Sequence, residues 1–144
     1  MEEAEKYATQ RQEAIAKVGG SYDGKFVMMR HTAIYETEHQ RQAALTAVQH
    51  NLGQFGNLMM KKGAVTNGFP EVIPFEQLKG NVRVDPAMLE QNLMFGNTEQ
   101  VVEKLRAYKA LGIDGFIYYT SMGLGHKEQK QSLERFIEAV MPHF

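Results

Sequence analysis

The sequence contains no cysteine, no long apolar run and no excess of either charge. Without cysteine, a disulfide framework, thiolate catalysis and a zinc site built on sulfur are excluded. The 16 basic and 17 acidic residues leave a formal charge of -1, and no block of like charge could attract a phosphate backbone or an anionic membrane. We therefore expect neither nucleic acid nor a membrane as a partner. The lack of cysteine fits a cytoplasmic location.

Apolar runs are short, because Lys, Glu, Gln or Gly interrupts each of them before the ~18 residues that a membrane span requires. The amino end, Met1–Arg11, is charged and helical in character, so it does not resemble a secretion signal. Hydrophobic residues make up 43% of the chain and charged residues 23%, which is typical of a folded globular protein. We expect one soluble domain over residues 1–144.

The first half of the chain shows a helix, a strand and a second helix. Apolar residues recur at helical spacing over Glu3–Val18, and Phe26–Tyr35 is a β-rich run that predicts a strand. Thr37 and Gln40 have the spacing of a capping box, after which apolar positions continue at helical spacing as far as Phe55. A helix should therefore begin directly after the first strand.

The middle of the chain is less regular. Lys61–Val84 contains glycines, asparagines and two prolines without sustained periodicity, so we expect a long, mobile loop that proteases cut first. Asp85 before a proline predicts the start of a short helix over Asp85–Gln91. Asn92–Phe95 should then form a second short strand.

The last third repeats the strand and helix pattern. Asn97 and Gln100 form a second capping-box signal, and the helix that follows should close at Gly112. Phe116–Thr120 predicts a third strand, and a loop over Ser121–Gly125 leads to a final helix that Pro142 ends. The apolar stripe of this helix consists of Leu133, Phe136, Ile137, Val140 and Met141.

A helix followed by three strand-helix units indicates an α/β fold with a parallel sheet. Ligands of such folds meet the carboxyl ends of the strands. In this chain those ends are Tyr35–Thr37, Gly96–Thr98 and Thr120–Gly123.

Several motifs resemble the luciferase-like flavin monooxygenases. The stretch from Leu93 to the end of the chain, with FGNTEQV, GIDGF, TSMGLGH and the closing SLERFIEAVMPHF, is similar to the last two barrel units of that family. The run VMMRHTAIYETE is similar to its sixth strand and the helix start after it. The chain thus resembles the carboxy-terminal part of such an enzyme.

The resemblance implies a partial (β/α)8 TIM barrel of about three parallel βα units after a helix. It also implies a dimeric enzyme that uses reduced FMN, or in some branches a deazaflavin, to oxidise a small organic substrate with oxygen. The family's first five strands have no counterpart here, and whole barrels run to ~250 residues. The alternative is a catalytically silent fragment or paralogue that associates with itself or with a partner.

The loop after the third predicted strand is the strongest candidate site. The hydroxyls of Thr120 and Ser121, with the backbone amides of Met122, Gly123 and Gly125 at a helix start, could cradle an anion or the polar edge of a flavin. The equal alternative is that both glycines only shape a strand-to-helix turn.

Two residues in the first strand are weaker catalytic candidates. Arg30 could hold a phosphate or carboxylate, although a structural ion pair is the more common role of such a residue. His31, on the opposite strand face, could act as an acid or base because its pKa lies near neutrality. No metal is expected, since His39 and His50 are 11 residues apart and roughly 16 Å from each other on one helix.

The isolated strands should expose apolar side chains that a complete barrel would cover. We therefore expect a homodimer or a higher closed oligomer rather than a monomer. The exposed set is either Val27, Met29, Ile117 and Tyr119 or the alternate-face residues Met28 and Tyr118.

Overall fold

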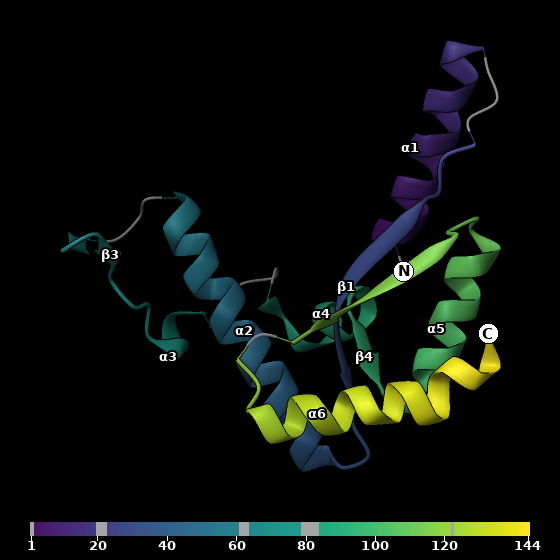
Figure 1. Ribbon diagram of the computed structural model, residues 1–144. Coiled ribbons are helices and arrows are strands. Elements are labelled where there is room, and N and C mark those ends of the chain that lie inside the picture. Colours follow the sequence, from purple (N-terminus) through teal and green to yellow (C-terminus); the bar gives the residue numbers. More distant parts are fainter. Residues whose placement is uncertain (1, 20–22, 61–63, 79–83, 122) are drawn as a thin grey trace.

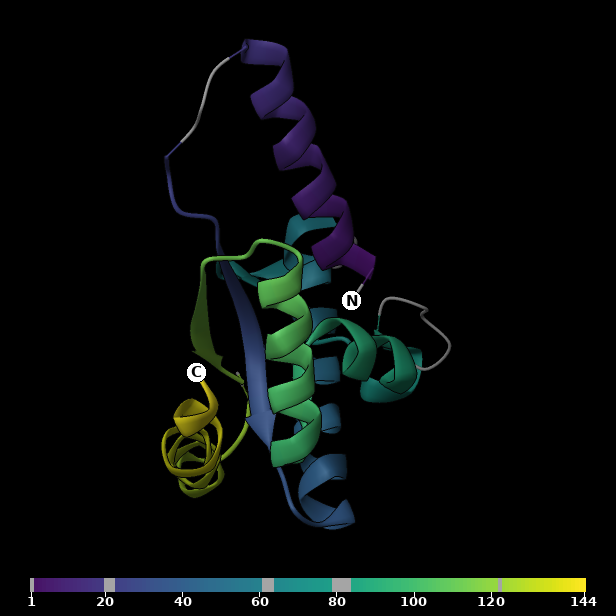
Figure 2. The ribbon, with the colours of Figure 1, turned by 90° about the vertical axis from the view of Figure 1, so that its right-hand side faces the viewer.

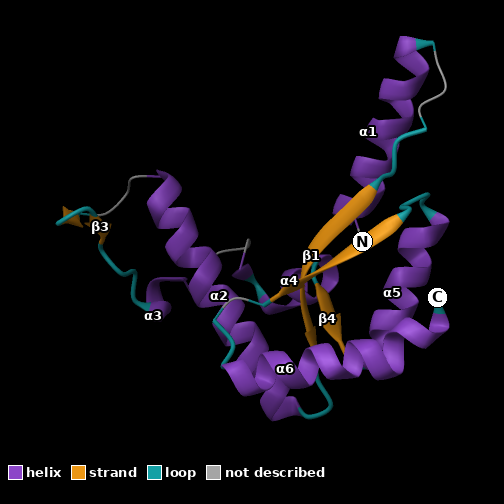
Figure 3. Cartoon of the chain, viewed as in Figure 1, coloured by secondary structure: helices purple, strands orange, loops and turns teal. Residues whose placement is uncertain are grey.

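The computed structural model describes residues 2–19, 23–60, 64–78, 84–121 and 123–144. Within these residues no helix is long and apolar enough to cross a membrane. The elements are α1 Glu2–Val18, β1 Val27–Ile34, α2 Glu38–Met60, β2 Val65–Thr66, β3 Phe69–Pro70, α3 Phe75–Leu78, α4 Pro86–Asn92, β4 Met94–Gly96, α5 Thr98–Ala110, β5 Gly115–Thr120 and α6 His126–Arg135. A π-helical turn at Phe136–Val140 and a 3-10 turn at Met141–His143 follow (Figures 1 and 3).

The main sheet has three parallel strands in the order β4-β1-β5. Thr32 pairs with Met94 on one side and with Thr120 on the other, so the first strand in sequence is the central one. This confirms a parallel α/β fold of three βα units after a helix. Consecutive strands of a closed barrel are neighbours, whereas here β5 lies beside β1 rather than beside β4.

Helices cover the two faces of this sheet unequally, with α5 and α2 on opposite sides (Figures 1 and 2). One face packs along its whole length against α5 and the end of the chain. Its core consists of Met28, Ile34, Met94, Val101, Leu105 and Val140, together with Ala4 of α1. The other face is covered only toward the carboxyl ends of the strands, where Ala33 and Phe95 pack against Leu45 and Val48 of α2 and Leu89 of α4.

The amino-terminal half of that second face is exposed. Val27, Met29 and Ile117 are 43%, 52% and 50% accessible, whereas Met28 on the first face is 5% accessible. Of the two sets of apolar residues expected to be exposed, the structure therefore selects the one that contains Met29. Tyr118 instead lies on the covered face, where its hydroxyl group is 2.8 Å from Ser132 Oγ.

Local side-chain caps determine where the helices begin. Asp85 Oδ1 accepts hydrogen bonds from the backbone N–H groups of Ala87 and Met88, and Pro86 occupies the first helical position. Asn97 and Gln100 form a complete capping box, with both hydrogen bonds at 2.9 Å. The Thr37 and Gln40 pair repeats this arrangement at the start of α2.

The expected long loop is partly structured. Val65 to Pro70 forms a small antiparallel hairpin, and its turn residues Asn67 and Gly68 have φ values of 51° and 82°. Both φ values are positive, as a tight two-residue hairpin turn requires, and an Asn-Gly pair favours them. The expectation of a continuous loop is therefore wrong for residues 64–78. Residues 61–63 and 79–83 lie outside the described residues, and the mobility of the segment stays a prediction.

The predicted stripe of the last helix is divided between two environments. Phe136 packs against Phe116 and Tyr118, and Val140 is fully buried. Leu133, Ile137 and Met141, by contrast, are 40%, 51% and 54% accessible. The expectation that all five residues form one core-facing stripe is thus wrong for these three, which we call the C-terminal stripe.

Candidate functional site

The loop after β5 lies at the carboxyl end of the sheet, as the sequence predicted. Thr120 pairs with Thr32 of β1, and Ser121 is completely buried. Gly123 has a φ of 89°, and a Cβ atom there would lie 3.0 Å from the carbonyl oxygen of Ala47 in α2. Glycine at this position therefore satisfies both a left-handed conformation and close packing on α2. Met122 lies outside the described residues.

Ser121 is the unusual residue of this loop. Among the described residues its hydroxyl group is buried without a hydrogen-bond partner. Buried polar groups are nearly always paired in folded proteins, so an unpaired hydroxyl calls for an explanation such as a ligand or a bound water.

The amino end of α6 is already complemented by negative charge. Gly125 caps this helix without a side-chain hydrogen bond, and a Cβ atom there would collide with the Glu128 carboxylate. Because a carboxylate near a helix N-terminus interacts favourably with the helix dipole, Glu128 takes the place that a bound anion would need. The geometry favours a neutral polar group over a phosphate at this loop.

The two candidates in β1 point to opposite faces of the sheet. Arg30 Nη2 lies 3.3 Å from Glu3 Oε2 of α1, which is the structural ion pair that was the alternative to ligand binding. The His31 ring lies 4.6 Å from the Tyr119 ring, on the incompletely covered face. Burial lowers the pKa of His31, so its neutral form is favoured at neutral pH. Neither residue approaches the loop at Ser121 through any contact in the structure.

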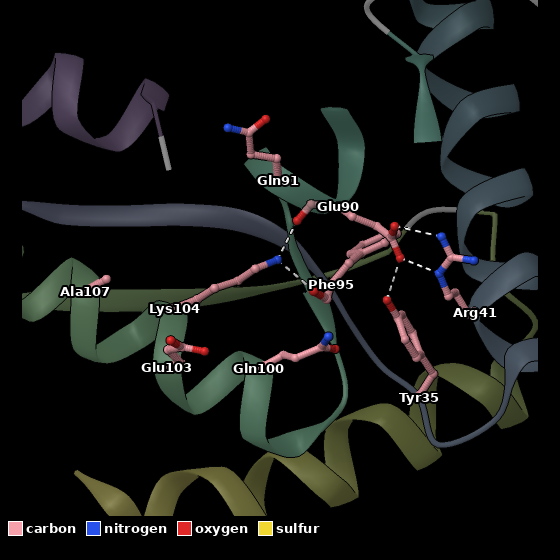
Figure 4. A pocket seen from close by; sticks show the side chains of 9 residues that line it. All are labelled: Tyr35, Arg41, Glu90, Gln91, Phe95, Gln100, Glu103, Lys104 and Ala107. Carbon is pink, nitrogen blue, oxygen red and sulfur yellow. Dashed lines mark hydrogen bonds and ion pairs between the residues drawn. The ribbon is translucent and has the colours of Figure 1, made fainter. Parts of the chain in front are cut away.

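A pocket of about 610 Å³ lies between α2, α4, β4 and α5 (Figure 4). Its charged groups come from three helices, namely Arg41, Glu90, Glu103 and Lys104, and they balance to zero net charge. Tyr35, which directly follows β1, and Gln100, in the first turn of α5, place one end of the pocket near the carboxyl ends of β1 and β4.

Glu90 organises one wall of the pocket. Its carboxylate accepts hydrogen bonds from Arg41 Nε and Nη2 and, at 2.8 Å, from the Tyr35 hydroxyl group. The hydrogen bonds from Arg41 lower the pKa of Glu90, and burial next to Glu90 raises the pKa of Tyr35. These three side chains stabilise the packing of α2 on α4, and their strongest donors are used within the protein.

Lys104 forms the opposite wall. Its ammonium group donates to the backbone carbonyl oxygens of Glu90, of Leu93 at 3.0 Å and of Phe95 at 2.7 Å. An ammonium group has three donors, so its hydrogen-bonding capacity is used. Burial lowers the pKa of Lys104 to about 8. Lys104 therefore binds the end of α4 to β4.

Sequence reasoning did not identify Arg41, Glu90 or Lys104. Arg41 and Glu90 are 49 positions apart, and such a pairing leaves no local pattern. Within the described residues, no group of three or more His, Asp or Glu side chains could hold a metal ion.

One curated protein is similar to nearly the whole chain. It is the oxygenase component of a flavin-dependent trigonelline monooxygenase from Acinetobacter baylyi, 26% identical over 143 residues, or 99% of this chain. The chain spans 40% of the length of that relative and corresponds to its carboxy-terminal portion. No protein-family model and no solved structure matches. The similarity confirms the resemblance to the carboxy-terminal portion of a flavin monooxygenase.

Proposed function

We propose that this chain is the carboxy-terminal portion of a flavin-dependent monooxygenase, and that it contributes the loop after β5 to the site of reduced FMN. The similarity to the trigonelline monooxygenase component supports the class of enzyme. Reduced flavin supplies the electrons with which oxygen is activated, and one oxygen atom passes to a small organic substrate. We expect a cytoplasmic homodimer or higher closed oligomer, with a deazaflavin as the alternative cofactor.

The observation that carries the assignment of the site is the buried, unpaired hydroxyl group of Ser121. A polar edge of a flavin ring, which offers neutral donors and acceptors, would satisfy this hydroxyl group. Thr120, Gly123 and Gly125 would shape the loop around the ring. The Glu128 carboxylate opposes a phosphate at the same place, so the FMN phosphate has to be held elsewhere.

A comparison of FMN with riboflavin tests which part of the cofactor the loop contacts. The purified chain is titrated with each compound, and the dissociation constants are obtained from quenching of flavin fluorescence. If the loop contacts the ring, both compounds bind with similar affinity and Glu128→Gln changes neither. If the loop holds the phosphate, FMN binds more tightly and Glu128→Gln improves FMN binding alone. The second result would contradict the proposed site.

Gly125→Val provides a second test of the same loop. A branched side chain at this position meets the Glu128 carboxylate and blocks close approach of a ligand to the backbone. We expect flavin binding to weaken more than the free energy of unfolding decreases. Equal losses of both would favour the alternative in which the glycines only shape the turn.

A silent, self-associating module is the second candidate function. The exposure of Val27, Met29 and Ile117 on one sheet face favours association whether or not flavin binds. A chain that binds no flavin under any reduced or oxidised condition, yet forms a defined oligomer, would support this second function over the first.

A further inference from the structure

The two edges of the main sheet differ in whether they can accept another strand. At the β4 edge, Gly96 O accepts a hydrogen bond from Tyr35 N, so this carbonyl points toward β1. Successive carbonyls of a strand alternate in direction, so those of Phe95 and Leu93 point outward, and Lys104 binds both. A buried lysine on outward carbonyls hinders strand addition at this edge.

The β5 edge has no comparable cap. Among the described residues, β5 pairs with β1 alone, so its outer backbone groups are available to another strand. The strand is six residues long and carries no charged side chain, and Ile117 at its centre is half exposed. A long, uncharged, apolar edge strand is a site where a second strand adds.

The C-terminal stripe lies next to this edge. Ser132 and Phe136 contact Tyr118 of β5, so the last helix lies across the covered face of β5. Each residue of the C-terminal stripe directly follows one of the buried positions Ser132, Phe136 and Val140 in sequence. The helix thus presents a second apolar side, beyond the one that contacts β5, to whatever lies outside it.

We propose that the β5 edge and the C-terminal stripe together form the interface with a second copy of this chain. The β5 strands of two copies pair antiparallel about a two-fold axis, which joins the two sheets into one sheet of six strands. The same axis brings the two C-terminal stripes against each other. This inference specifies the oligomer of the proposed function and does not depend on flavin binding.

Three properties of the surface favour a second copy. In a two-fold interface each element meets its own copy, so a strand without charged residues avoids repulsion between like charges. Ile117 and the C-terminal stripe are each 40% to 54% exposed. If a fully exposed large apolar side chain offers on the order of 200 Å², these side chains and the paired backbone supply a substantial part of the ~800 Å² per partner in a standard interface.

The capped β4 edge sets the size of the assembly. If both edges were open, each copy could add another and the sheet would grow without limit. With Lys104 on the β4 edge, pairing through β5 uses the available edge of each copy. The assembly therefore closes at two.

Light scattering of the purified chain at micromolar concentration, coupled to gel filtration, measures the assembly. We expect a dimer of the wild-type chain and monomers of Ile117→Lys and Ile137→Glu, because both variants place charges in the interface. Val72→Lys, at an exposed apolar residue outside the interface, is the matched control and should remain a dimer. Circular dichroism checks that all variants are folded, and half-exposed positions leave no core cavity in either variant. A monomeric or open-ended wild-type assembly would overturn the proposal, as would dimers of both interface variants.

Single cysteines locate the two-fold axis, since the chain contains no native cysteine. Variants with cysteine at each position from 116 to 119 are oxidised and separated without reducing agent. Cross-linking should peak at one position on β5, because only residues near the axis come within disulfide distance of their own copies. Val65→Cys in the exposed hairpin is the control and should cross-link weakly. Uniform cross-linking at all sites would contradict a defined interface, whereas a failed flavin titration would affect only the enzymatic assignment.

Discussion

The two edge strands of the main sheet are built in opposite ways. All three residues of β4 are buried, its outward carbonyls are bound by Lys104, and α4 and α5 lie against it. No residue of the longer β5 is classed with that buried core, and its centre is half exposed. The comparison teaches that one side of this sheet is complete, while the other still offers backbone groups and apolar surface to a partner.

The largest difference should appear when one apolar side chain is shortened on each edge. Phe95→Ala removes a 1% accessible ring and should lower the free energy of unfolding by about 3–5 kcal/mol. Ile117→Ala should lower it by less than about 1 kcal/mol when measured on the monomeric Ile137→Glu background. Urea unfolding of both variants measures the difference. Equal losses would show that the two edges are equally complete in solution.

Removal of the cap should make the two edges alike. Lys104→Met leaves three backbone carbonyls without their charged donor and should lower the free energy of unfolding by roughly 2–3 kcal/mol. The opened β4 edge should also allow assemblies larger than a dimer, which light scattering detects. Lys109→Met, at an exposed position of the same helix, is the control and should change neither property.

The titration of Lys104 should give the complete edge its own pH dependence. Burial lowers the pKa of Lys104 to about 8 in the folded chain, below the ~10.4 of an unfolded lysine. Between these values the unfolded state binds more protons, so the contribution of Lys104 to stability rises with pH and is smallest below pH 8. From pH 8 to 10 we expect a gain of about 1 kcal/mol relative to Lys104→Met. A constant difference between the two proteins would contradict the lowered pKa.

The smallest expected effect concerns two buried serines that border β5. Ser132 Oγ is 2.7 Å from Ile34 N and 2.8 Å from the Tyr118 hydroxyl group, whereas Ser121 Oγ has no partner among the described residues. Ser132→Ala should therefore lower the free energy of unfolding by about 1–2 kcal/mol, and Ser121→Ala should leave it unchanged or raise it by up to ~1 kcal/mol. Thermal unfolding of the flavin-free variants measures both changes. A clear loss for Ser121→Ala would show that its hydroxyl group is paired in solution.

Features that depend on neighbouring residues could be predicted from the sequence. The caps at Thr37, Asp85 and Asn97 were expected at the positions where the structure shows them, because their partners lie two or three residues away. The Asn67-Gly68 turn carried an equally local hairpin signal, although its strands are only two residues long. Alternation along β1 and β5 also placed Tyr118 and Tyr119 on opposite faces correctly.

Features that depend on distant parts of the chain could not be predicted. The order β4-β1-β5 follows from which strands meet β1, and helical or strand periodicity contains no information about that choice. The division of the last helix depends on the π-helical turn at Phe136–Val140, which changes the rotation of the residues after it. In the candidate site, the loop position of Ser121 was foreseen, but the approach of Glu128 to Gly125 required the folded helix.

The central position of β1 also has a consequence for the time course of folding. The backbone N–H of Phe26, just before β1, bonds to Asp114, 88 residues later, and the main sheet contains no hairpin. During synthesis at ~5–20 residues per second, β1 therefore leaves the ribosome several seconds before the last of its partners. Contacts of such long sequence separation also slow folding after the chain is complete. Pulse-labelling by hydrogen exchange should show the amides of β1 protected late, after those of α5.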